Sequence, residues 1–431
     1  MSRPGAGTFV ASRSAKPAGR TRDTSWQSVA LGERVIDTAG MSPLADPPDV
    51  ESQGIPDTAG DLGEGGLISL ASGYPHPSLM PARVLSVALT HAARLPGAWD
   101  RPPAAGLAAL RTWFAREVST QAEPGDVLIT PGGQAAISAA FRAVLRAGDA
   151  LLAESPTYPG ALAAARLAGL RVFPVPVDDD GVVPDLLAEA LGRSGARAFY
   201  CQPTYSNPVG SVLAAERREQ VLSIARAAGA FVIEDDASHW LSHGRRTPAP
   251  LLDDDTDGRV IYVTSLTKAT SPSLRVGAVI ARGPVAARLR AALAVNDLFV
   301  ARPLQEAALD LVTRPGWQGH LRDLGLELGV RAQALSAALH EQLPGLKFTV
   351  PAGGVHLWAR VPGDADADDA DAAFQARRAG VIVLPGRPFF PAEPSGPYLR
   401  LTFSAASSQA SLAEAVRRLA ALPLLTAVSK D

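Results

Sequence analysis

Seven short apolar runs along the middle of the chain constrain its fold more than any other feature. Helical segments separate most of them, and in one such segment Ile137, Phe141 and Val144 place an apolar stripe on one helix face. The runs, each of strand length, are residues 127–129, 150–153, 171–177, 198–201, 231–233, 260–263 and 278–281. Strands that alternate with helices form a mostly parallel sheet covered on both faces. The sequence therefore predicts an α/β fold built on a seven-stranded, mostly parallel sheet.

A second group of apolar runs follows a long helical stretch that begins near residue 305. These runs are residues 348–351, 356–360, 381–384 and 399–403. With 431 residues and 47% hydrophobic content, the chain is long enough for more than one compact unit. The expected organisation is a large domain at 99–304 and a smaller α+β domain formed by 66–98 together with 305–431.

Residues 1–65 differ in texture from the rest of the chain. They are rich in Gly, Pro, Ser and Asp and lack a sustained hydrophobic period, which predicts a disordered arm and linker. The arm is basic at its start, because the first 22 residues contain no acid. Its cationic residues there are Arg3, Arg13, Lys16, Arg20 and Arg22.

Composition excludes several classes of protein. A net charge of -2 gives no overall preference for nucleic acid or for membranes. The single cysteine, Cys201, excludes an internal disulfide framework and a cysteine-rich zinc site, and it suits a reducing compartment. No apolar run approaches the roughly 20 residues of a membrane-spanning helix. We therefore expect a cytoplasmic protein without a membrane partner or a bound metal.

A lysine between hydroxyl side chains lies just after the apolar run 260–263. Lys268 offers an amine that can condense with an aldehyde. Ser265 and Arg275 can hold a dianionic phosphate, the arginine through its planar fork of donors. An aldehyde and a phosphate on one ligand indicate pyridoxal 5'-phosphate. A lone Ser-x-x-Lys is more often an exposed loop lysine, so this interpretation depends on partners elsewhere in the chain.

Two turns at strand ends supply the first partners. Gly132 and Gly133 lie between a strand and a helix, where backbone N–H groups and the helix dipole can receive phosphate. Tyr158 follows the run 150–153, at the strand end where open α/β sheets bind ligands, and it could stack on a pyridine ring. Alone, a Gly-Gly turn is more often a plain loop, and Tyr158 could equally pack on its neighbours.

Polar residues after the next two strands add to this set. Asn207 offers a donor to a phenolate oxygen, although Asn-Pro is also ordinary turn chemistry. One of the acids Glu234, Asp235 and Asp236 could pair with a pyridinium nitrogen, so that the ring withdraws electrons from a substrate carbanion. Acids at strand ends are also often helix caps.

An arginine inside the apolar run 399–403 is the candidate anchor for a substrate carboxylate. Arg400 has apolar neighbours on both sides, which makes a surface position on an edge strand less favourable. The mechanism inferred from these residues needs an electron sink, a lysine that also moves a proton, and an arginine that holds an amino acid.

From residue 67 to the carboxyl terminus, the ordered set of motifs resembles the fold type I pyridoxal-phosphate enzymes of aminotransferase class I/II. The resemblance is strongest to the aminotransferase-like domain of MocR-type regulators, which belong to the GntR family. It covers roughly five sixths of the chain, and eight or so motifs in one order are specific. The further matching segments are residues 73–77, 106–111, 351–358 and 384–389.

The resemblance implies a fold type I large domain, a homodimer with sites at its interface, and a role for each candidate residue. Lys268 would form the Schiff base with the cofactor, Asp235 would pair with the ring nitrogen, and Tyr158 would stack on the ring. Asn207 would bind the ring hydroxyl. Phosphate would be held by Gly132, Gly133, Ser265 and Arg275, and the substrate by Arg400, Gly73 and Asn207.

Three positions depart from the pattern of these relatives. Ser238 stands where many have a tyrosine three residues after the pyridine-binding aspartate. Serine is shorter than tyrosine, so its hydroxyl is not expected to reach the ring hydroxyl of the cofactor. Trp99 occupies a position where relatives offer a tyrosine hydroxyl to the neighbouring subunit's phosphate. Pro131 stands where a serine is common, and proline has neither a hydroxyl nor an N–H. Cofactor binding is compatible with these changes, whereas fast turnover is less assured.

The first ten residues resemble the wing of a GntR-type winged helix. MocR regulators have that wing upstream of a linker and an aminotransferase-like domain, and no recognition helix precedes it here. A wing without its helices cannot read a major groove, so specific DNA binding is not expected of this chain. Two functions remain open: an aminotransferase acting on an amino acid and a 2-oxo acid, or a cofactor-binding sensor of an amine effector with little or no full turnover.

Overall fold

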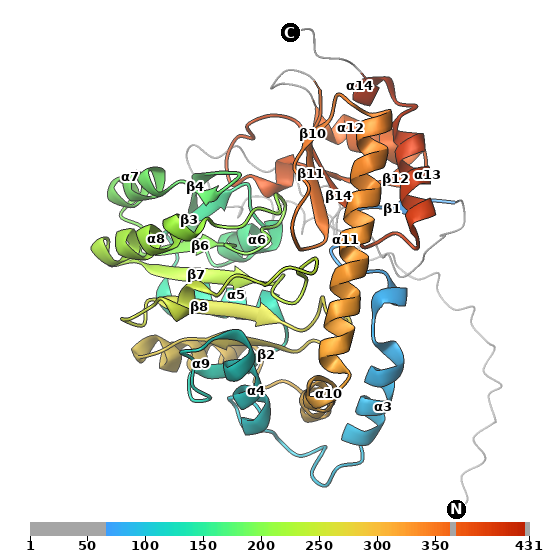
Figure 1. Cartoon of the computed structure of the whole chain (residues 1–431). Helices are drawn as coiled ribbons and strands as arrows, with labels where there is room; N and C mark the ends of the chain where they lie inside the picture. The colour runs from blue at the N-terminus through green and yellow to red at the C-terminus, as the bar shows by residue number, and fades with distance from the viewer. Residues whose placement is uncertain (1–65, 363–367, 427–431) are drawn as a thin grey trace, which may run out of the picture. The chain divides into compact units, whose positions relative to one another are not determined.

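The computed structural model describes residues 66–362 and 368–426, and the predicted arm with its wing remnant, residues 1–65, lies outside them. An eight-stranded sheet in the order β2-β9-β8-β7-β6-β3-β4-β5 forms the largest layer of the described residues (Figure 1). Its strands are β2 (Val127–Thr130), β3 (Ala150–Ser155), β4 (Arg171–Asp178), β5 (Gly181–Val182), β6 (Ala198–Cys201), β7 (Phe231–Asp236), β8 (Val260–Ser265) and β9 (Gly277–Ile280).

The sheet is mixed, with a parallel centre. Strands β4, β3, β6, β7 and β8 run parallel to one another, whereas β9 is antiparallel to β2 and β8. The predicted α/β fold is confirmed, and each of the seven predicted runs contributes a strand. The eighth strand, β5, pairs antiparallel with β4 after a short turn. Two residues are too few to give a periodic signal, so the sequence did not predict this strand.

Helices cover both faces of the sheet, which explains why its strands are apolar on both sides. One face packs against α5 (Gly133–Val144), α6 (Pro159–Leu167) and α9 (Pro284–Asn296). The other packs against α4 (Ala108–Val118), α7 (Pro184–Ser194) and α8 (Ala215–Ala227). Alternate residues of each strand enter the two cores, so that Tyr200 and Ile233 face α5 while Phe199 and Val232 face the opposite side.

A smaller antiparallel sheet in the order β10-β11-β14-β13 follows in the chain. Its strands are β10 (Lys347–Phe348), β11 (His356–Arg360), β13 (Leu384–Pro385) and β14 (Tyr398–Thr402). A separate parallel pair joins β1 (Ile68–Ser69) to β12 (Val381–Ile382), so the start of the described chain lies beside its carboxyl-terminal part. The exact domain boundaries at 98/99 and 304/305 stay predictions.

The remaining helices flank these sheets. Figure 1 shows the long helix α11 extending from α10 toward α13, with α3 beside α10. These helices are α3 (Ala82–Ala92), α10 (Arg302–Thr313), α11 (Trp317–Gln342), α12 (Asp369–Arg378), α13 (Gln409–Leu419) and α14 (Pro423–Thr426). Short 3-10 turns occur at η1 (Pro77–Leu79), η2 (Leu251–Asp253) and η3 (Arg387–Phe389).

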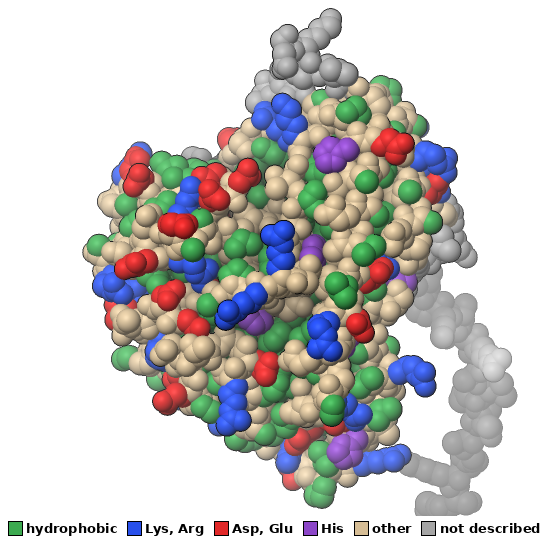
Figure 2. Space-filling view, viewed as in Figure 1, with side chains coloured by type: hydrophobic (Ala, Val, Ile, Leu, Met, Phe, Trp, Pro, Cys, Tyr) green, Lys and Arg blue, Asp and Glu red, His purple; other side chains and the backbone are tan. Residues whose placement is uncertain are grey.

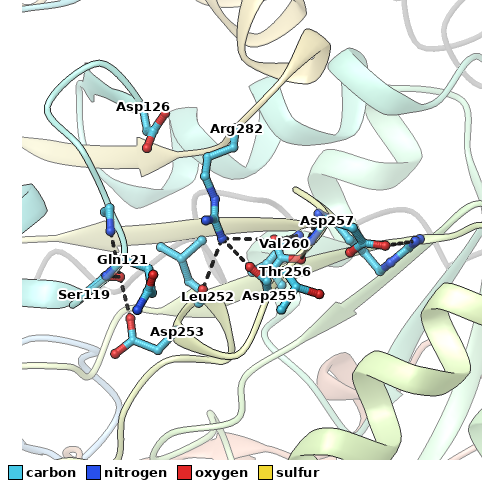
Figure 3. Close-up of polar contacts among 12 residues, drawn as sticks. Ser119, Gln121, Asp126, Leu252, Asp253, Asp255, Thr256, Asp257, Val260 and Arg282 are labelled. Atoms are coloured by element: carbon cyan, nitrogen blue, oxygen red, sulfur yellow. Dashed lines mark hydrogen bonds and ion pairs between the residues drawn. The ribbon is translucent and has the colours of Figure 1, made fainter.

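A polar network fixes the start of β8, the strand that leads to Ser265 and Lys268. The carboxylate of Asp255 accepts hydrogen bonds from the backbone N–H groups of Arg259 and Val260, at 3.1 and 3.0 Å. Arg282, just after β9, donates to the Asp255 carbonyl at 2.6 Å, as Figure 3 shows. The amino end of β8 and the carboxyl end of β9 are thereby tied to one loop.

Residues 66–362 and 368–426 contain neither a membrane-spanning helix nor a group of side chains arranged to hold a metal ion. No helix there is long and apolar enough to cross a membrane, and no group of His, Cys, Asp and Glu side chains is arranged to hold a metal ion. On the face drawn in Figure 2, Lys and Arg side chains are interspersed with Asp and Glu.

The loop after β7 packs tightly on α11 at two glycines. A Cβ placed on Gly325 would collide with the carbonyl oxygen of Ser242, and one on Gly329 would lie 3.3 Å from the Cβ of His243. The same loop reaches the small sheet, because Ser242 forms a bridge with Gly353 and a ring nitrogen of His243 lies 2.9 Å from the Gly354 carbonyl. The glycines of α11 thus allow one loop to contact both parts of the fold.

We expect Gly325→Ala to lower the free energy of unfolding by about 1–3 kcal/mol, because a backbone carbonyl must move to admit the methyl group. Gly319→Ala, in the same helix, is the matched control: its Cβ would meet only Arg322 Nη2, at 3.8 Å. There the higher helix propensity of alanine should stabilise the chain by up to about 1 kcal/mol. Thermal and urea denaturation of both variants measure the difference, and equal stabilities would contradict the predicted clash.

Candidate functional site

The residues predicted to hold phosphate converge between β2, β8 and β9. Helix α5 begins at Gly133, after Gly132 with φ of 91° and no side-chain cap. The first N–H groups of a helix lack intrahelical partners, so they can bind an anion. A Cβ on Gly133 would lie 3.8 Å from the Cβ of Ser265, and one on Gly132 would lie 2.7 Å from Arg275 Nη2. The four predicted residues therefore form one cradle.

Pro131 contributes to this cradle through its backbone carbonyl group. Arg275 donates from Nη2 to the Pro131 carbonyl oxygen at 2.8 Å, which holds the guanidinium against Gly132. Gly277 permits the same approach from β9, because a Cβ there would lie 2.7 Å from the Thr264 carbonyl oxygen and 3.1 Å from Gly132. The departure at Pro131 removes a hydroxyl and leaves a carbonyl that positions the arginine.

Lys268 follows β8 in a turn where it feels the charges of both a carboxylate and a guanidinium. Burial lowers the pKa of its ammonium to about 8, the charge of Asp235 opposes this shift, and Arg400 adds to it. Ser265 and Thr267 fix the turn, since Ser265 Oγ accepts from the Thr267 N–H at 3.1 Å. The position gives a lysine that loses its proton far more readily than an exposed one.

Asp235 is buried at the end of β7 with one oxygen paired and one unpaired. Its Oδ2 accepts hydrogen bonds from Tyr200 Oη at 2.6 Å and from Gln202 Nε2 at 3.0 Å. Its Oδ1 is buried and has no hydrogen-bond partner among the described residues. Burial raises the pKa of Asp235, while Tyr200, Lys268 and Gln202 lower it. A buried acceptor without a donor is costly, so Oδ1 is the natural partner of a ligand N–H.

Tyr158 lies among the same groups. Burial raises the pKa of its phenol to about 12, Asp235 and Tyr74 add to the rise, and Arg400 and Arg275 oppose it. The ring leans over Gly160, where a Cβ would collide with it. Tyr158 is therefore close enough to Asp235, Arg400 and Arg275 to feel their charges, and its stacking on a ring stays a prediction.

Arg400 and Asn207 meet at the boundary between the two sheets. Arg400 donates from Nη1 to Asn207 Oδ1 at 3.2 Å and from Nη2 to the Ala71 carbonyl oxygen at 2.6 Å. Its Nε is buried without a partner among the described residues, and its guanidinium lies 5.2 Å from the ring centre of Phe389. Burial lowers the pKa of Arg400 to about 9. Gly73 lies two residues after Ala71, and a Cβ on it would meet nothing within 4 Å.

The other two departures lie apart from the phosphate cradle. Ser238 is buried, and its Oγ lies 3.9 Å from the position of a Cβ on Gly354, beside the small sheet. Trp99 is 80% exposed.

The sequence did not single out three polar residues that the structure places here. Tyr200 and Gln202 bind Asp235, and His356 lies on the same face of the small sheet as Arg400, since His356 pairs with Thr402 and Trp358 with Arg400. His356 Nδ1 lies 3.1 Å from Thr402 Oγ1, and its Nε2 is buried without a partner among the described residues. Burial, then Arg400 and Lys268, hold its pKa well below the usual range. Only His356, a polar residue within an apolar strand, had a signal in the sequence.

The residues present fit pyridoxal 5'-phosphate. The lysine with a lowered pKa suits the aldehyde, and the cradle at the start of α5 suits the phosphate. The unpaired buried carboxylate oxygen suits the ring nitrogen, and the aromatic ring of Tyr158 suits the ring face. Arg400 is not needed for any of these cofactor groups, so it could bind a substrate carboxylate.

Comparison with known proteins gives the same class. The family model of aminotransferase class I and II matches residues 84–419. The chain is 31% identical over 360 residues to the 2-aminoadipate transaminase of Thermus thermophilus, covering 82% of this chain and 89% of that protein. It is also 30% identical over 302 residues to the HTH-type transcriptional regulator TauR of Rhodobacter capsulatus, covering 69% and 60%.

Solved structures agree with this similarity. One is LysN, the α-aminoadipate aminotransferase of Thermus thermophilus in complex with N-(5'-phosphopyridoxyl)-L-leucine, with a TM-score of 0.78, 31% identity, and coverage of 83% of this chain and 92% of that one. An archaeal alanine:glyoxylate aminotransferase gives a TM-score of 0.78 at 30% identity, covering 82% and 90%. The chain belongs to the aminotransferase class I and II family, with the fold type I architecture, and pyridoxal 5'-phosphate is its cofactor.

We expect Gly132→Ala to weaken cofactor binding by about tenfold to hundredfold, because its methyl group would displace the Arg275 guanidinium and lose a charge-assisted contact. Gly148→Ala is the control, since Gly148 has a similar φ of 88° but open space around a Cβ. Equilibrium titration with pyridoxal 5'-phosphate compares the two. Equal loss of affinity in both variants would show that backbone strain, not the cradle, is responsible.

The lowered pKa of Lys268 predicts how cofactor capture depends on pH. Only the neutral amine attacks an aldehyde, so the capture rate should rise with pH and level off above about 8. Stopped-flow absorbance of the cofactor-free chain measures this rate. Nα-acetyl-lysine in the same buffers, with an ordinary pKa of about 10.4, corrects for changes in the cofactor itself. A rate that still climbs steeply at a pH of about 10 would contradict a desolvated lysine.

Proposed function

We propose that this chain transfers an amino group between an amino acid and a 2-oxo acid. The observation that supports this most is the meeting of Lys268, Asp235 and Arg400 in one buried site, where the pKa values of all three are shifted. When bound, the cofactor supplies a carbonyl carbon that accepts the amino group and a ring that withdraws electrons. The chain's own residues would bind the substrate, hold the ring and move protons.

Arg400 would bind the substrate carboxylate. It is buried, its Nε has no partner among the described residues, and Asn207 and Ala71 fix its plane through the two terminal nitrogens. A planar guanidinium oriented in this way suits a carboxylate. This end of the substrate is shared by all amino acids and 2-oxo acids, so Arg400 would not select the side chain.

Lys268 would move the proton at the substrate α-carbon. Its pKa of about 8 lies near neutral pH, where a group can both take up and release a proton efficiently. Asp235, held by two donors, would keep the ring nitrogen protonated through Oδ1. Tyr158 would cover one ring face, and Asn207 would contact the ring hydroxyl.

We further propose a homodimer. Large apolar side chains at Trp99, Val295 and Leu298 are more than half exposed, so they are available for contact with a second copy of the chain. Sedimentation of the purified chain measures this state. A cytoplasmic location stays a prediction.

A sensor function is the second candidate, and its support is the similarity to regulators. Besides TauR, the HTH-type regulator YdcR of Escherichia coli is 28% identical over 332 residues, covering 75% of this chain and 70% of that protein. A sensor of this kind would bind the cofactor and an amine ligand without completing transamination.

Absorption spectra distinguish the two functions. We expect a visible band at about 410–430 nm that requires Lys268 and is absent from Lys268→Ala. If an amino acid removes the band and a 2-oxo acid restores it, the chain is an aminotransferase. A band that shifts and stays shifted would favour the sensor, and no Lys268-dependent band would exclude both.

The role of Arg400 can be tested with the same reaction. Arg400→Gln should raise the KM for the amino acid about tenfold to hundredfold, because a hydrogen-bonded ion pair with the carboxylate is lost. Arg360→Gln is the control, since Arg360 lies in the neighbouring strand β11 and is exposed. An unchanged KM in Arg400→Gln would show that the carboxylate binds elsewhere.

A further inference from the structure

Two side chains from the end of β6 donate to the same oxygen of Asp235. Tyr200 Oη lies 2.6 Å and Gln202 Nε2 lies 3.0 Å from Oδ2. The other oxygen, Oδ1, is equally buried and has no partner among residues 66–362 and 368–426. The asymmetry means that the chain itself saturates one oxygen and leaves the other for a ligand.

The strand pairing explains this arrangement. Parallel strands β6 and β7 place Tyr200 opposite Ile233, so Gln202 and Asp235 follow two residues later on the same sheet face. Tyr200 is fully buried, and Phe141 of α5 packs edge-on against its ring with the ring centres 5.9 Å apart. The hydroxyl is therefore held in place by both the sheet and the helix that covers it.

Gln202 also connects Asp235 to the turn that contains Asn207. Its Oε1 accepts the backbone N–H of Asn207 at 3.2 Å, which fixes the orientation of the amide. Its backbone N–H donates to Glu154 Oε2 at 2.8 Å. One side chain thus sets the spacing between the group for the ring nitrogen and the group for the ring hydroxyl.

The groups around Asp235 act on its pKa in both directions. The charge of Lys268 lowers the pKa of Asp235, whereas the charge of Asp236 on the same strand raises it. Glu154 is buried behind Gln202, and burial raises its pKa to about 7. Burial and the neighbouring acid raise the pKa of Asp235, and against them the hydrogen bond from Tyr200 lowers it most, followed by the charge of Lys268 and the hydrogen bond from Gln202.

We propose that Tyr200 and Gln202 are positioning residues that keep the cofactor's ring nitrogen protonated by making Asp235 a weaker base and aiming Oδ1 at that nitrogen. The inference rests on the proposed function, because it concerns the same cofactor. One proton is shared between the nitrogen and Oδ1, and no other group gains or loses one. Removing a donor makes Asp235 more basic, so the proton moves from the nitrogen to Oδ1.

The test uses the whole chain loaded with pyridoxal 5'-phosphate labelled with ¹⁵N in the ring. Tyr200→Phe keeps the aromatic ring and removes one donor, and Tyr200→Phe with Gln202→Leu removes both. Each lost donor should shift the proton equilibrium toward Oδ1 about tenfold to hundredfold. The ¹⁵N resonance should therefore move from the protonated toward the unprotonated position, most in the double variant. Gln202→Leu should also weaken cofactor binding more than Tyr200→Phe, because it frees the Asn207 turn.

Tyr262→Phe is the matched control. Tyr262 is as buried as Tyr200, and its hydroxyl donates at 2.8 Å to Asp236, the next residue of β7, on the opposite sheet face. It should leave the ¹⁵N resonance unchanged. The same resonance in wild type, Tyr200→Phe and the double variant would overturn the inference, as would an equal shift in Tyr262→Phe.

The proposed function is tested separately in the same samples. A wild-type chain with the Lys268-dependent band and an unprotonated ring nitrogen would overturn the inference and leave the aminotransferase function standing. A wild-type chain without that band would overturn both. Thermal denaturation checks that each variant is folded, and Tyr200→Phe alone decides the outcome if the double variant does not fold.

Discussion

The group formed by buried Asp235, buried Arg400 and half-buried Lys268 is the constraint on which the rest of the site depends. Removing charges from water is expensive, and hydrogen bonds to Asp235 and from Arg400 offset part of that cost. Asp235 favours the charged lysine, whereas Arg400 and burial favour the neutral one. The balance leaves an amine that can be deprotonated near neutral pH, beside an arginine and an acid whose hydrogen bonds are already in place.

The fold satisfies this constraint by bringing strand ends together. Strands β6, β7 and β8 are parallel, so Gln202, Asp235 and Lys268 all follow or end strands at one edge of the sheet. Close backbone approach at Gly132 and Gly277 brings together, at the same edge, the residues predicted to hold phosphate. The small sheet adds Arg400, which completes the group.

The sequence predicted the parts of this site that stand out against their surroundings. Lys268, Asp235 and Asn207 are polar residues within about six positions after apolar runs. The alternation of those runs with helices predicted a parallel sheet, in which these residues are expected to lie together. Tyr200 was hidden because tyrosine is an ordinary residue inside a buried strand, and Gln202 because nothing local indicates which neighbour it faces. The hydrogen bond from Arg400 to Ala71 joins residues 329 positions apart, and no local pattern contains that information. The roles assigned to the individual site residues stay predictions until the variants are measured.

The hydrogen bond between Arg400 and Ala71 affects the order in which parts of the site can form during folding. The residues proposed to hold the cofactor, from Gly132 to Arg275, lie in one continuous stretch that folds around the large sheet. Arg400 reaches Ala71 only when nearly the whole chain has been synthesised, and contacts between distant residues form slowly. A chain that ends before Arg400 would therefore lack the proposed substrate anchor, although it could contain every residue proposed to hold the cofactor.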